Sequence, residues 1–389
     1  MTVMREDTTT RSARLVGEYS PGDFLLATGH RTVLGRSVRQ AVTDTDPVRL
    51  AERVSAALAE SATPIAVGVL PFDTGAGSTT PGRVVVPAAL RIAGPAHPAF
   101  AALSSVEIGT PVSVRPVPEP AGHAAAVSRA LAELADGDLR KVVLARALDL
   151  RFAEPVPAAA ILHNLVRDNP RGYTYAAGLP GGRTLVGASP ELLLARQGDR
   201  VVSHPHAGSM PRSADPVVDR ANGAALLASG KDHVEHKVLT EAVVETLRPF
   251  CRRLDVPAEP ALVGTPTMWH LGTTITGELV DREVSALRLA AALHPTPAVC
   301  GTPTEPARRL VAELEPFDRG YYAGAVGWVD ADGDGEWAVA IRCAEVADRS
   351  LRLYAGGGIV PASDPLAELD ETSAKFQTLL RAMGLSLDL

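Results

Sequence analysis

Residues 141–150 read KVVLARALDL, and this run of β-branched and other apolar residues predicts a strand. Because successive side chains of a strand point to opposite faces, Lys141, Val143 and Ala145 share one face. After this run, strand-like and helix-like segments alternate to the end of the chain, with no repeat of fixed period. The sequence therefore predicts a mixed α/β or α+β fold.

The part of the chain before this strand contains shorter strand-like runs, punctuated by glycine and proline. They are DFLLATG (23–29), PIAVGVLPF (64–72) and RVVVPAALRI (83–92). The proline-rich stretch PVSVRPVPEPAGH (111–123) resembles a boundary. We therefore distinguish a less characteristic part, residues 1–120, from residues 121–389.

The composition excludes several classes of protein. A formal net charge of -7 argues against a broad nucleic-acid surface. The N-terminus MTVMREDTTTRSARL lacks the apolar core of a secretory signal, and no run approaches about 18 apolar residues. The three cysteines form no CxxC pair. These features predict a cytoplasmic protein with no membrane or nucleic-acid partner.

Two later segments predict strands with special positions. TLVGASPELLLAR (184–196) predicts a strand, a tight turn and a strand, with Gly187 and Pro190 as the turn residues. EWAVAIRCAEV (336–346) alternates as a single strand that sets Arg342 among alanines. A long cation among small side chains suits a pocket for an anion, but it equally suits an arginine that covers a solvent-facing strand.

Two predicted helices each carry carboxylates on one face. The first, at 231–250, has Val234 and other apolar residues near helical spacing and sets Asp232 and Glu235 three residues apart. The second begins with Asp364 as the N-cap residue and Pro365 at the first helical position. Its polar face carries Glu368, Glu371 and Lys375.

The two carboxylate faces allow two interpretations. A hard cation such as Mg²⁺ prefers oxygen ligands and is commonly held by one or two carboxylates. However, charged helix faces are usually solvated, and spacing alone favours that alternative. The three glycines of YAGGGIVPAS (354–363) likewise suit either close approach of a ligand or a plain flexible turn.

Ten blocks in order resemble the chorismate-binding enzymes, the family of isochorismate, salicylate, anthranilate and aminodeoxychorismate synthases. The blocks are KVVLAR, GASPE, AGSMPR, KDHVEH, TPTMWHL, HPTPAVCG, ELEPFDR, AIRCAE, YAGGGIVPAS and DETSAK. The resemblance spans about residues 138–380, and FLLATGHRTVLG and VLPFD extend it weakly toward the N-terminus. It implies a single large α/β domain like that of anthranilate synthase component I, with a two-sheet core flanked by outer helices.

The resemblance also implies the site. It places Mg²⁺ on Glu235 and Glu371, with Asp232 and Glu368 as nearby or water-mediated supports, so it overturns the solvated-face alternative. It implies that chorismate is bound by Gly208, Ser209, His270, Thr296, Ala298, Arg342, Gly356, Gly357, Gly358 and Lys375. Within that set, Arg342, Lys375 and the glycine backbone resemble carboxylate binders, and His270 resembles a polar contact beside the ring.

Lys141 and Glu191 match the two residues that such synthases place on opposite faces of the ring. Isomerising chorismate to isochorismate requires water to add at C2 while the C4 hydroxyl departs, so one group takes a proton and another gives one. We expect Lys141 to be the base and Glu191 the acid. A glutamate serves as an acid near neutrality only if its pKa is raised.

Lys141 and HPTPAVCG (294–301) favour isochorismate synthase within the family. The ammonia-using anthranilate type usually has Gln at the position of Lys141 and a block like HPxGTxSGAPK, so water is the expected nucleophile and no glutaminase subunit is expected. Salicylate synthase, which also eliminates pyruvate, is the alternative. A non-catalytic chorismate- or partner-binding descendant would be expected to lack Lys141, Glu191 or a metal glutamate, and all are present. The most similar synthases can act alone, which is compatible with a monomer.

Overall fold

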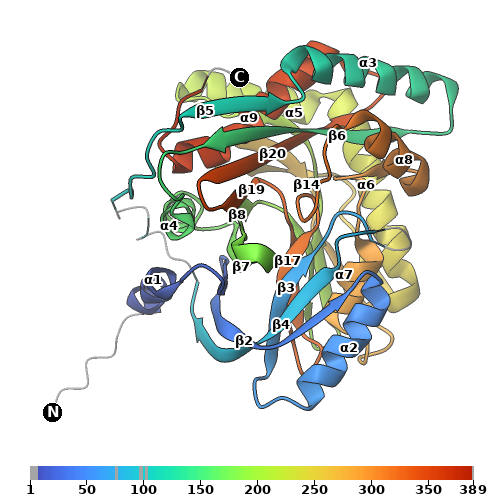
Figure 1. Ribbon diagram of the computed structural model, residues 1–389. Helices are drawn as coiled ribbons and strands as arrows, with labels where there is room; N and C mark the ends of the chain where they lie inside the picture. Colours follow the sequence, from blue (N-terminus) through green and yellow to red (C-terminus); the bar gives the residue numbers. More distant parts are fainter. Residues whose placement is uncertain (1–7, 75–77, 96–99, 101–103, 388–389) are drawn as a thin grey trace.

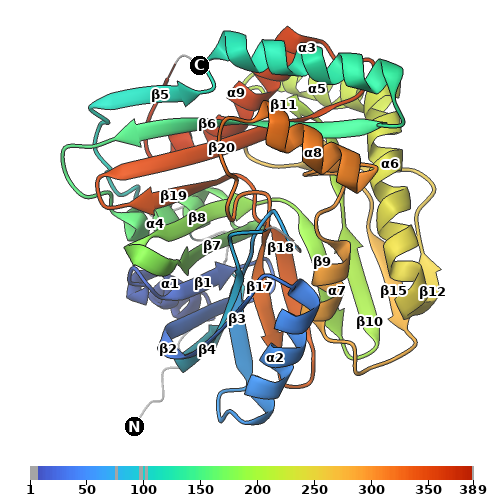
Figure 2. The same cartoon turned by 45° about the vertical axis from the view of Figure 1, so that its right-hand side comes forward.

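The computed structural model describes residues 8–74, 78–95, 100 and 104–387, and most of its strands form one antiparallel, hydrogen-bonded ribbon (Figures 1 and 2). The prediction that the N-terminus is not a secretory signal rests partly on the first seven residues, which lie outside the described residues. The ribbon turns back on itself, so that it forms two layers of strands with a core between them (Figure 2).

The first layer contains the strand expected at 141–150. In spatial order it consists of β5 (Ser113–Val117), β6 (Lys141–Arg151), β20 (Ser350–Ile359), β19 (Cys343–Ala347), β8 (Thr184–Ser189), β7 (Tyr173–Gly178) and β1 (Phe24–Ala27). The short β16 (Gly301–Thr302) also pairs with the start of β6. The proline-rich stretch that resembled a boundary thus supplies an edge strand, β5.

Two long strands lead from the first layer to the second. β2 (Thr32–Asp44) pairs with β1 at its start and with β4 (Gly82–Ala93) along its length, and a bulge between Val38 and Gln40 interrupts the register. A bulge bends its strand and increases the local twist. The second layer continues with β3 (Ile65–Leu70), β17 (Ala325–Asp330), β18 (Gly335–Val339), β9 (Leu192–Gln197), β10 (Arg200–His204), β15 (Ile275–Leu279) and β12 (Cys251–Asp255).

Both faces are buried along most of the first layer, with the exception of the edge strand β5, which explains why its inner strands are largely apolar. Tyr175 and Ala177 point into the core between the layers, whereas Ala176 points to a second core beneath outer helices. The helices that contribute to this second core are α1 (Thr8–Glu18), α4 (Ala158–Asp168) and α9 (Pro365–Ala382). The other outer helices are α2 (Pro47–Ala59), α3 (Pro120–Asp136), α7 (Ala286–Leu293) and α8 (Thr304–Leu314) (Figure 2).

A small sheet and two helices complete the part of the fold that holds the carboxylates. The sheet has the order β11 (His206–Pro211), β14 (Met268–Gly272) and β13 (Ala261–Gly264). It packs against α5 (Pro216–Ala228) and α6 (Gly230–Leu247). The helix expected at 231–250 is thus confirmed as far as Leu247, but Val234 does not belong to its buried face, because it is 61% exposed.

The segment at 184–196 forms two strands as expected, but these strands do not pair with each other. β8 pairs with β7 and β19, while β9 pairs with β10 and β18, so the chain crosses from the first layer to the second at Pro190 and Glu191. Gly187 lies inside β8 and not in the turn. A glycine is needed there because a Cβ atom would lie 2.6 Å from atoms of Cys343 and Tyr175.

The segment at 336–346 is likewise two strands and not one. β18 ends at Val339 in the second layer, and β19 begins at Cys343 in the first. Between them Arg342 adopts a φ of 50°, which a strand residue does not have. Since β18 pairs with β9 and β19 pairs with β8, the two crossings lie side by side. Glu191 and Arg342 therefore meet where the layers join.

Candidate active site

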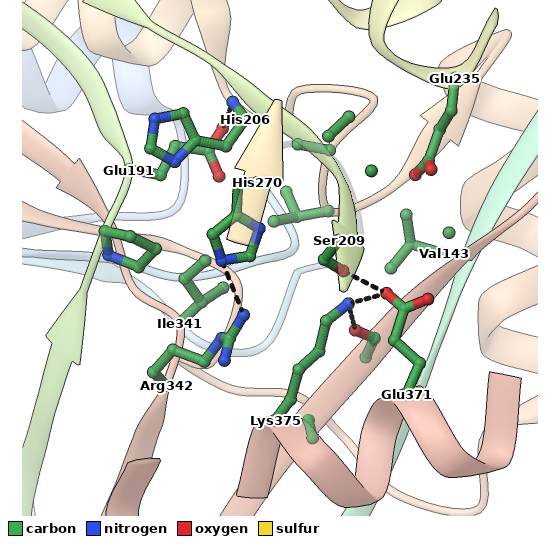
Figure 3. A pocket seen from close by; sticks show the side chains of 18 of the residues that line it. Val143, Glu191, His206, Ser209, Glu235, His270, Ile341, Arg342, Glu371 and Lys375 are labelled. Carbon is green, nitrogen blue, oxygen red and sulfur yellow. Dashed lines mark hydrogen bonds and ion pairs between the residues drawn. The ribbon is translucent and has the colours of Figure 1, made fainter. Parts of the chain in front are cut away.

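A pocket opens at this junction, bordered by the two crossings, the small sheet, α6, α9 and β20 (Figure 3). The predicted site residues that line it are Glu191, Gly208, Ser209, Glu235, His270, Ala298, Arg342, Gly356, Gly358, Glu371 and Lys375. The other predicted residues, which lie near the pocket or behind its wall, are Lys141, Asp232, Thr296, Gly357 and Glu368. The fold thus brings distant sequence motifs to one place.

Lys141 and Glu235 form a buried ion pair beside the pocket. Lys141 lies at the start of β6 and Glu235 on the second turn of α6, and the lysine Nζ is 2.9 Å from Glu235 Oε1. Gly358 on the neighbouring strand β20 makes this contact possible. A Cβ atom there would overlap the Glu235 carboxylate and would lie 2.9 Å from Lys141 Cε. The glycine run at 356–358 is therefore strand backbone that leaves room for charged side chains, and it is not a flexible turn.

Glu371 and Lys375 project from α9 into the pocket as a second ion pair. Lys375 Nζ is 2.6 Å from Glu371 Oε1 and also donates a hydrogen bond to the Gly356 carbonyl oxygen at 2.8 Å. The Ser209 hydroxyl donates to the same carboxylate oxygen at 2.7 Å (Figure 3). Burial opposes ionisation of Glu371, but Lys375 and the Ser209 hydroxyl lower the pKa of its carboxyl overall. Glu371 is thus held as a carboxylate.

Glu368 lies behind the glycine strand. Gly357 faces α9, and a Cβ atom there would lie 3.0 Å from Glu368 Oε2. Lys231 binds the other oxygen of Glu368 at 2.8 Å, while Oε2 is buried without a hydrogen-bond partner among the described residues. Burial and the charge of Glu371 raise the pKa of Glu368, and Lys231 opposes this rise.

Asp232 is the fourth predicted metal-site carboxylate, and its position is tied to both α6 and β11. Its carboxylate accepts a hydrogen bond from the hydroxyl of Ser229, the N-cap residue of α6. Gly208 on β11 leaves room for it, because a Cβ atom at Gly208 would lie 2.8 Å from Asp232 Cβ. Burial raises the pKa of Asp232.

The donor set suits a hard divalent cation, although the arrangement is not a closed cage. Glu235 and Glu371 offer carboxylate oxygens to the pocket from two helices, and Glu368 has an unpaired oxygen nearby. Among the described residues, no group of three or more possible ligands converges on one point. Mg²⁺ is usually held by one or two carboxylates and keeps water or substrate oxygens. Glu235 and Glu371 fit that requirement.

Glu191 lies on the opposite side of the pocket from Glu371 and Lys375 (Figure 3). It is buried at the crossing between β8 and β9, and its Oε1 accepts the backbone N–H of His206 at 3.4 Å. Burial raises the pKa of Glu191 to about 7, against the lowering effects of this N–H group and of nearby cations that include Lys141 and Arg342. Near neutral pH the carboxyl is therefore partly protonated and can give up a proton.

Arg342 and His270 form a buried pair at the base of the pocket. A guanidinium has no acceptor, so Arg342 Nη2 donates to His270 Nε2 at 3.4 Å. Burial and the charge of Arg342 hold the pKa of His270 well below its usual value, and the imidazole is neutral. Burial lowers the pKa of Arg342 to about 10, so it remains a cation at neutral pH. The pair gives this side of the pocket a fixed positive charge suited to a substrate anion.

A family model described as chorismate binding enzyme matches residues 105–384. The chain belongs to the chorismate-binding enzymes. Isochorismate synthase DhbC of Bacillus subtilis (strain 168) is 48% identical over 392 residues, which cover 97% of each chain. The crystal structure of a putative 2,3-dihydroxybenzoate-specific isochorismate synthase from Bacillus anthracis matches with a TM-score of 0.90 at 42% identity, over 96% of this chain and all of that one.

The predicted fold is also confirmed at greater evolutionary distance. Anthranilate synthase component I of Streptococcus pneumoniae is only 22% identical but matches with a TM-score of 0.70, over 93% of this chain and 90% of its own. The single α/β domain with a two-sheet core and outer helices is thus the architecture of this chorismate-binding enzyme. No helix in its described residues is long and apolar enough to cross a membrane.

Sequence reasoning about this chorismate-binding enzyme missed some residues of the site. His206 and Tyr322 line the pocket, and Lys231 pairs with Glu368. Lys231 could have been found from its spacing, because it precedes Glu235 by one helical turn. His206 stands two residues before the predicted Gly208, but the register shifts between Ala207 and Ser209, so strand alternation does not indicate its direction.

Proposed function

We propose that this chorismate-binding enzyme is an isochorismate synthase, which adds water at C2 of chorismate and expels the C4 hydroxyl with the help of Mg²⁺. The observation that carries the mechanism is Glu191, a buried carboxyl with a pKa of about 7 that lines the same pocket as Arg342 and Lys375. The pocket thus combines anion binding with a proton donor. The similarity to the isochorismate synthase DhbC over almost the whole chain supports the same reaction.

Chorismate carries two carboxylates and one hydroxyl, and the charges of the pocket suggest how it is oriented. We propose that Arg342, which is cationic and supported by His270, binds one carboxylate. Lys375 and the backbone at Gly356 and Gly358 border the other end of the pocket, where a second carboxylate would be held. The predicted contacts at Gly208, Ser209 and Ala298 border the same space. Thr296 and Gly357 act from behind the pocket wall in this proposal.

Glu191 gives its proton to the departing C4 hydroxyl in this mechanism. A hydroxide is a poor leaving group, so protonation by a positioned acid raises the rate by a factor of about 10²–10⁴. The buried position of Glu191 favours the neutral acid before the reaction. Once it has lost the proton, the nearby cations Lys141 and Arg342 stabilise the carboxylate.

Lys141 takes a proton from the attacking water in this mechanism, and its Nζ lies 2.9 Å from Glu235 Oε1. We propose that Glu235 and Glu371 hold Mg²⁺, with Asp232 and Glu368 as supports. Mg²⁺, when bound, would fix a substrate carboxylate and neutralise its charge.

The alternative within the family is a salicylate synthase, which would form isochorismate and then eliminate pyruvate. Purified protein, chorismate and Mg²⁺ should give isochorismate, and isochorismate as the starting material should give the same equilibrium mixture. EDTA should stop both directions. Salicylate and pyruvate as the main enzymatic products would move the assignment to the alternative, and anthranilate formed with ammonium salts would contradict water as the nucleophile.

We further propose that the isochorismate supplies siderophore, salicylate or related secondary metabolism, and that the enzyme works in the cytoplasm without a glutaminase subunit. The free state of Cys251, Cys300 and Cys343 in the structure agrees with a reducing compartment. Water as the nucleophile removes the need for an ammonia supply.

A further inference from the structure

His206 is a buried imidazole in the wall of the pocket that has no assigned task. It is 7% exposed, and its ring stacks on that of His270 with 5.7 Å between the ring centroids. Neither of its ring nitrogens has a hydrogen-bond partner among the described residues, although both are buried. Buried polar atoms are rarely left without a partner in proteins. His270, in contrast, already accepts a hydrogen bond from Arg342.

The position of His206 ties it to the acid. Its backbone N–H donates to the Glu191 carboxylate, and the His206 ring lies beside that carboxylate at one end of the pocket (Figure 3). Arg342 lies below His270, and Lys375 stands further along the pocket wall (Figure 3). A carboxylate of the substrate is attracted toward these cations, whereas Glu191 in its neutral acid form offers it no positive charge. The end beside His206 is therefore suited to a neutral polar group.

The ring of His206 is itself neutral. Burial, together with the neighbouring His204, His270 and Arg342, holds the pKa of His206 well below its usual value. A neutral imidazole has one N–H donor and one acceptor nitrogen. A hydroxyl group can both accept and donate a hydrogen bond, so it can satisfy either nitrogen.

We propose that His206 binds the C4 hydroxyl of the substrate and orients it toward Glu191, so that His206 selects ligands that carry a hydroxyl at this position. This inference rests on the proposed function, and it adds a specificity-determining residue to it. Stacking on His270 fixes the ring, and the backbone link to Glu191 fixes the distance between the hydroxyl-binding group and the acid. A site that hydrogen-bonds a substrate hydroxyl discriminates against analogues that lack it.

The test compares two inert ligands in variants of His206. 5,6-Dihydrochorismate keeps the C4 hydroxyl but lacks a double bond that must shift, and its 4-deoxy derivative lacks the hydroxyl as well. Inhibition constants of both are measured at saturating Mg²⁺. His206→Phe keeps a ring to stack on His270 but removes both nitrogens. It should reduce the preference for the hydroxylated ligand by about tenfold and leave binding of the 4-deoxy ligand nearly unchanged.

Further variants separate a hydrogen bond from packing. His206→Gln keeps a polar group and should restore part of the preference. His204→Phe is the matched control, because His204 contacts the outer side of the His206 ring, with 4.4 Å between the centroids, but does not line the pocket. It should leave the preference unchanged. If His206→Phe does not fold, as judged by its thermal unfolding, His206→Leu takes its place in the comparison.

The inference is overturned if removal of the ring nitrogens weakens the binding of both ligands equally, or if it changes neither inhibition constant. The first result would make His206 a packing residue, and the second would make it a bystander. The proposed function fails separately, if the wild-type enzyme binds neither inhibitor and forms no isochorismate from chorismate. Because the inhibition constants report binding alone, a wild-type enzyme that binds both ligands without preference contradicts only the role of His206.

Discussion

Glu191 and Arg342 owe their environment to two breaks in strands, at the point where the chain leaves one layer and enters the other. Each break ends a strand and directs a charged side chain into the pocket, and burial there raises the pKa of Glu191 while it lowers that of Arg342. Both shifts follow from the cost of burying a charge. The sequence motifs identified both residues. The expected alternation along one continuous strand does not explain where the Arg342 side chain points, because the strand is interrupted there.

Replacement of Glu191 by Gln should remove the proton donor while it preserves the shape of the side chain. We expect kcat to fall by about 10²–10⁴-fold with little change in KM. In the wild-type enzyme the rate should decline as pH rises through about 7, because the acid with its raised pKa loses its proton there. Residual activity of Glu191→Gln should lack this basic limb. A variant that keeps the limb and changes only KM would show that Glu191 merely binds substrate.

Replacement of Lys141 by Ala should fail in a different way. It removes the base but leaves Arg342 and Lys375 to bind chorismate, so the loss should lie mainly in kcat, again by about 10²–10⁴-fold. Any residual rate should keep the decline as pH rises through about 7, because that limb belongs to Glu191. Equilibrium binding of an inert chorismate analogue serves as the control. A large loss of that binding, with kcat preserved at saturation, would contradict the role of base.

At the level of elements, α6 and α9 hold their carboxylates against one strand, β20, and each of three carboxylates is paired with a lysine. The pairs are Lys141–Glu235, Lys231–Glu368 and Lys375–Glu371. The glycines of β20 let the carboxylates approach, as Gly358 does for Glu235. The site therefore depends on how two helices dock on the glycine stretch of one strand.

Glu235→Gln or Glu371→Gln should reduce activity by orders of magnitude and raise the Mg²⁺ concentration needed for half-maximal rate, because each removes a negative charge and a ligand. Glu241→Gln is a matched control on α6, since Glu241 is exposed and only loosely paired with Lys237 at 3.9 Å. It should behave as wild type. Near-normal turnover of a Glu235 or Glu371 variant at low Mg²⁺ would exclude that residue as a ligand.

The helices were predictable from local signals, whereas the strand breaks were not. Asp364 caps α9 through its side chain and Pro365 follows, as the sequence indicated. At 336–346 the apolar alternation of the sequence continues through Arg342, but the structure has two separate strands there. The break arises because the chain crosses between two layers at this point. Periodicity reports which side chains are buried, and here both faces are buried.

At the scale of the whole molecule, the pocket exists because a single ribbon of strands turns back on itself to form two layers. β1 near the N-terminus pairs with β7, and β3 pairs with β17 more than 250 residues later in the chain, so the early strands belong to the same sheet as the motifs. Pairings at this separation leave no local signal in a sequence. The resemblance to the chorismate-binding enzymes supplied the architecture. Spacing could place Lys231 on the same helix face as Glu235, but its pairing with Glu368 and the position of His206 required the folded chain.

The central claim, that water from solvent attacks C2 of chorismate in this pocket, is tested most directly by isotope labelling. Purified enzyme, chorismate and Mg²⁺ are mixed in water enriched in oxygen-18, and the first isochorismate formed is analysed by mass spectrometry. We predict one labelled oxygen per molecule, located at C2, and no labelled product when EDTA is present. Isochorismate without the label would show that the C2 oxygen does not come from water, and labelled salicylate with pyruvate as the main product would assign the enzyme to a different reaction.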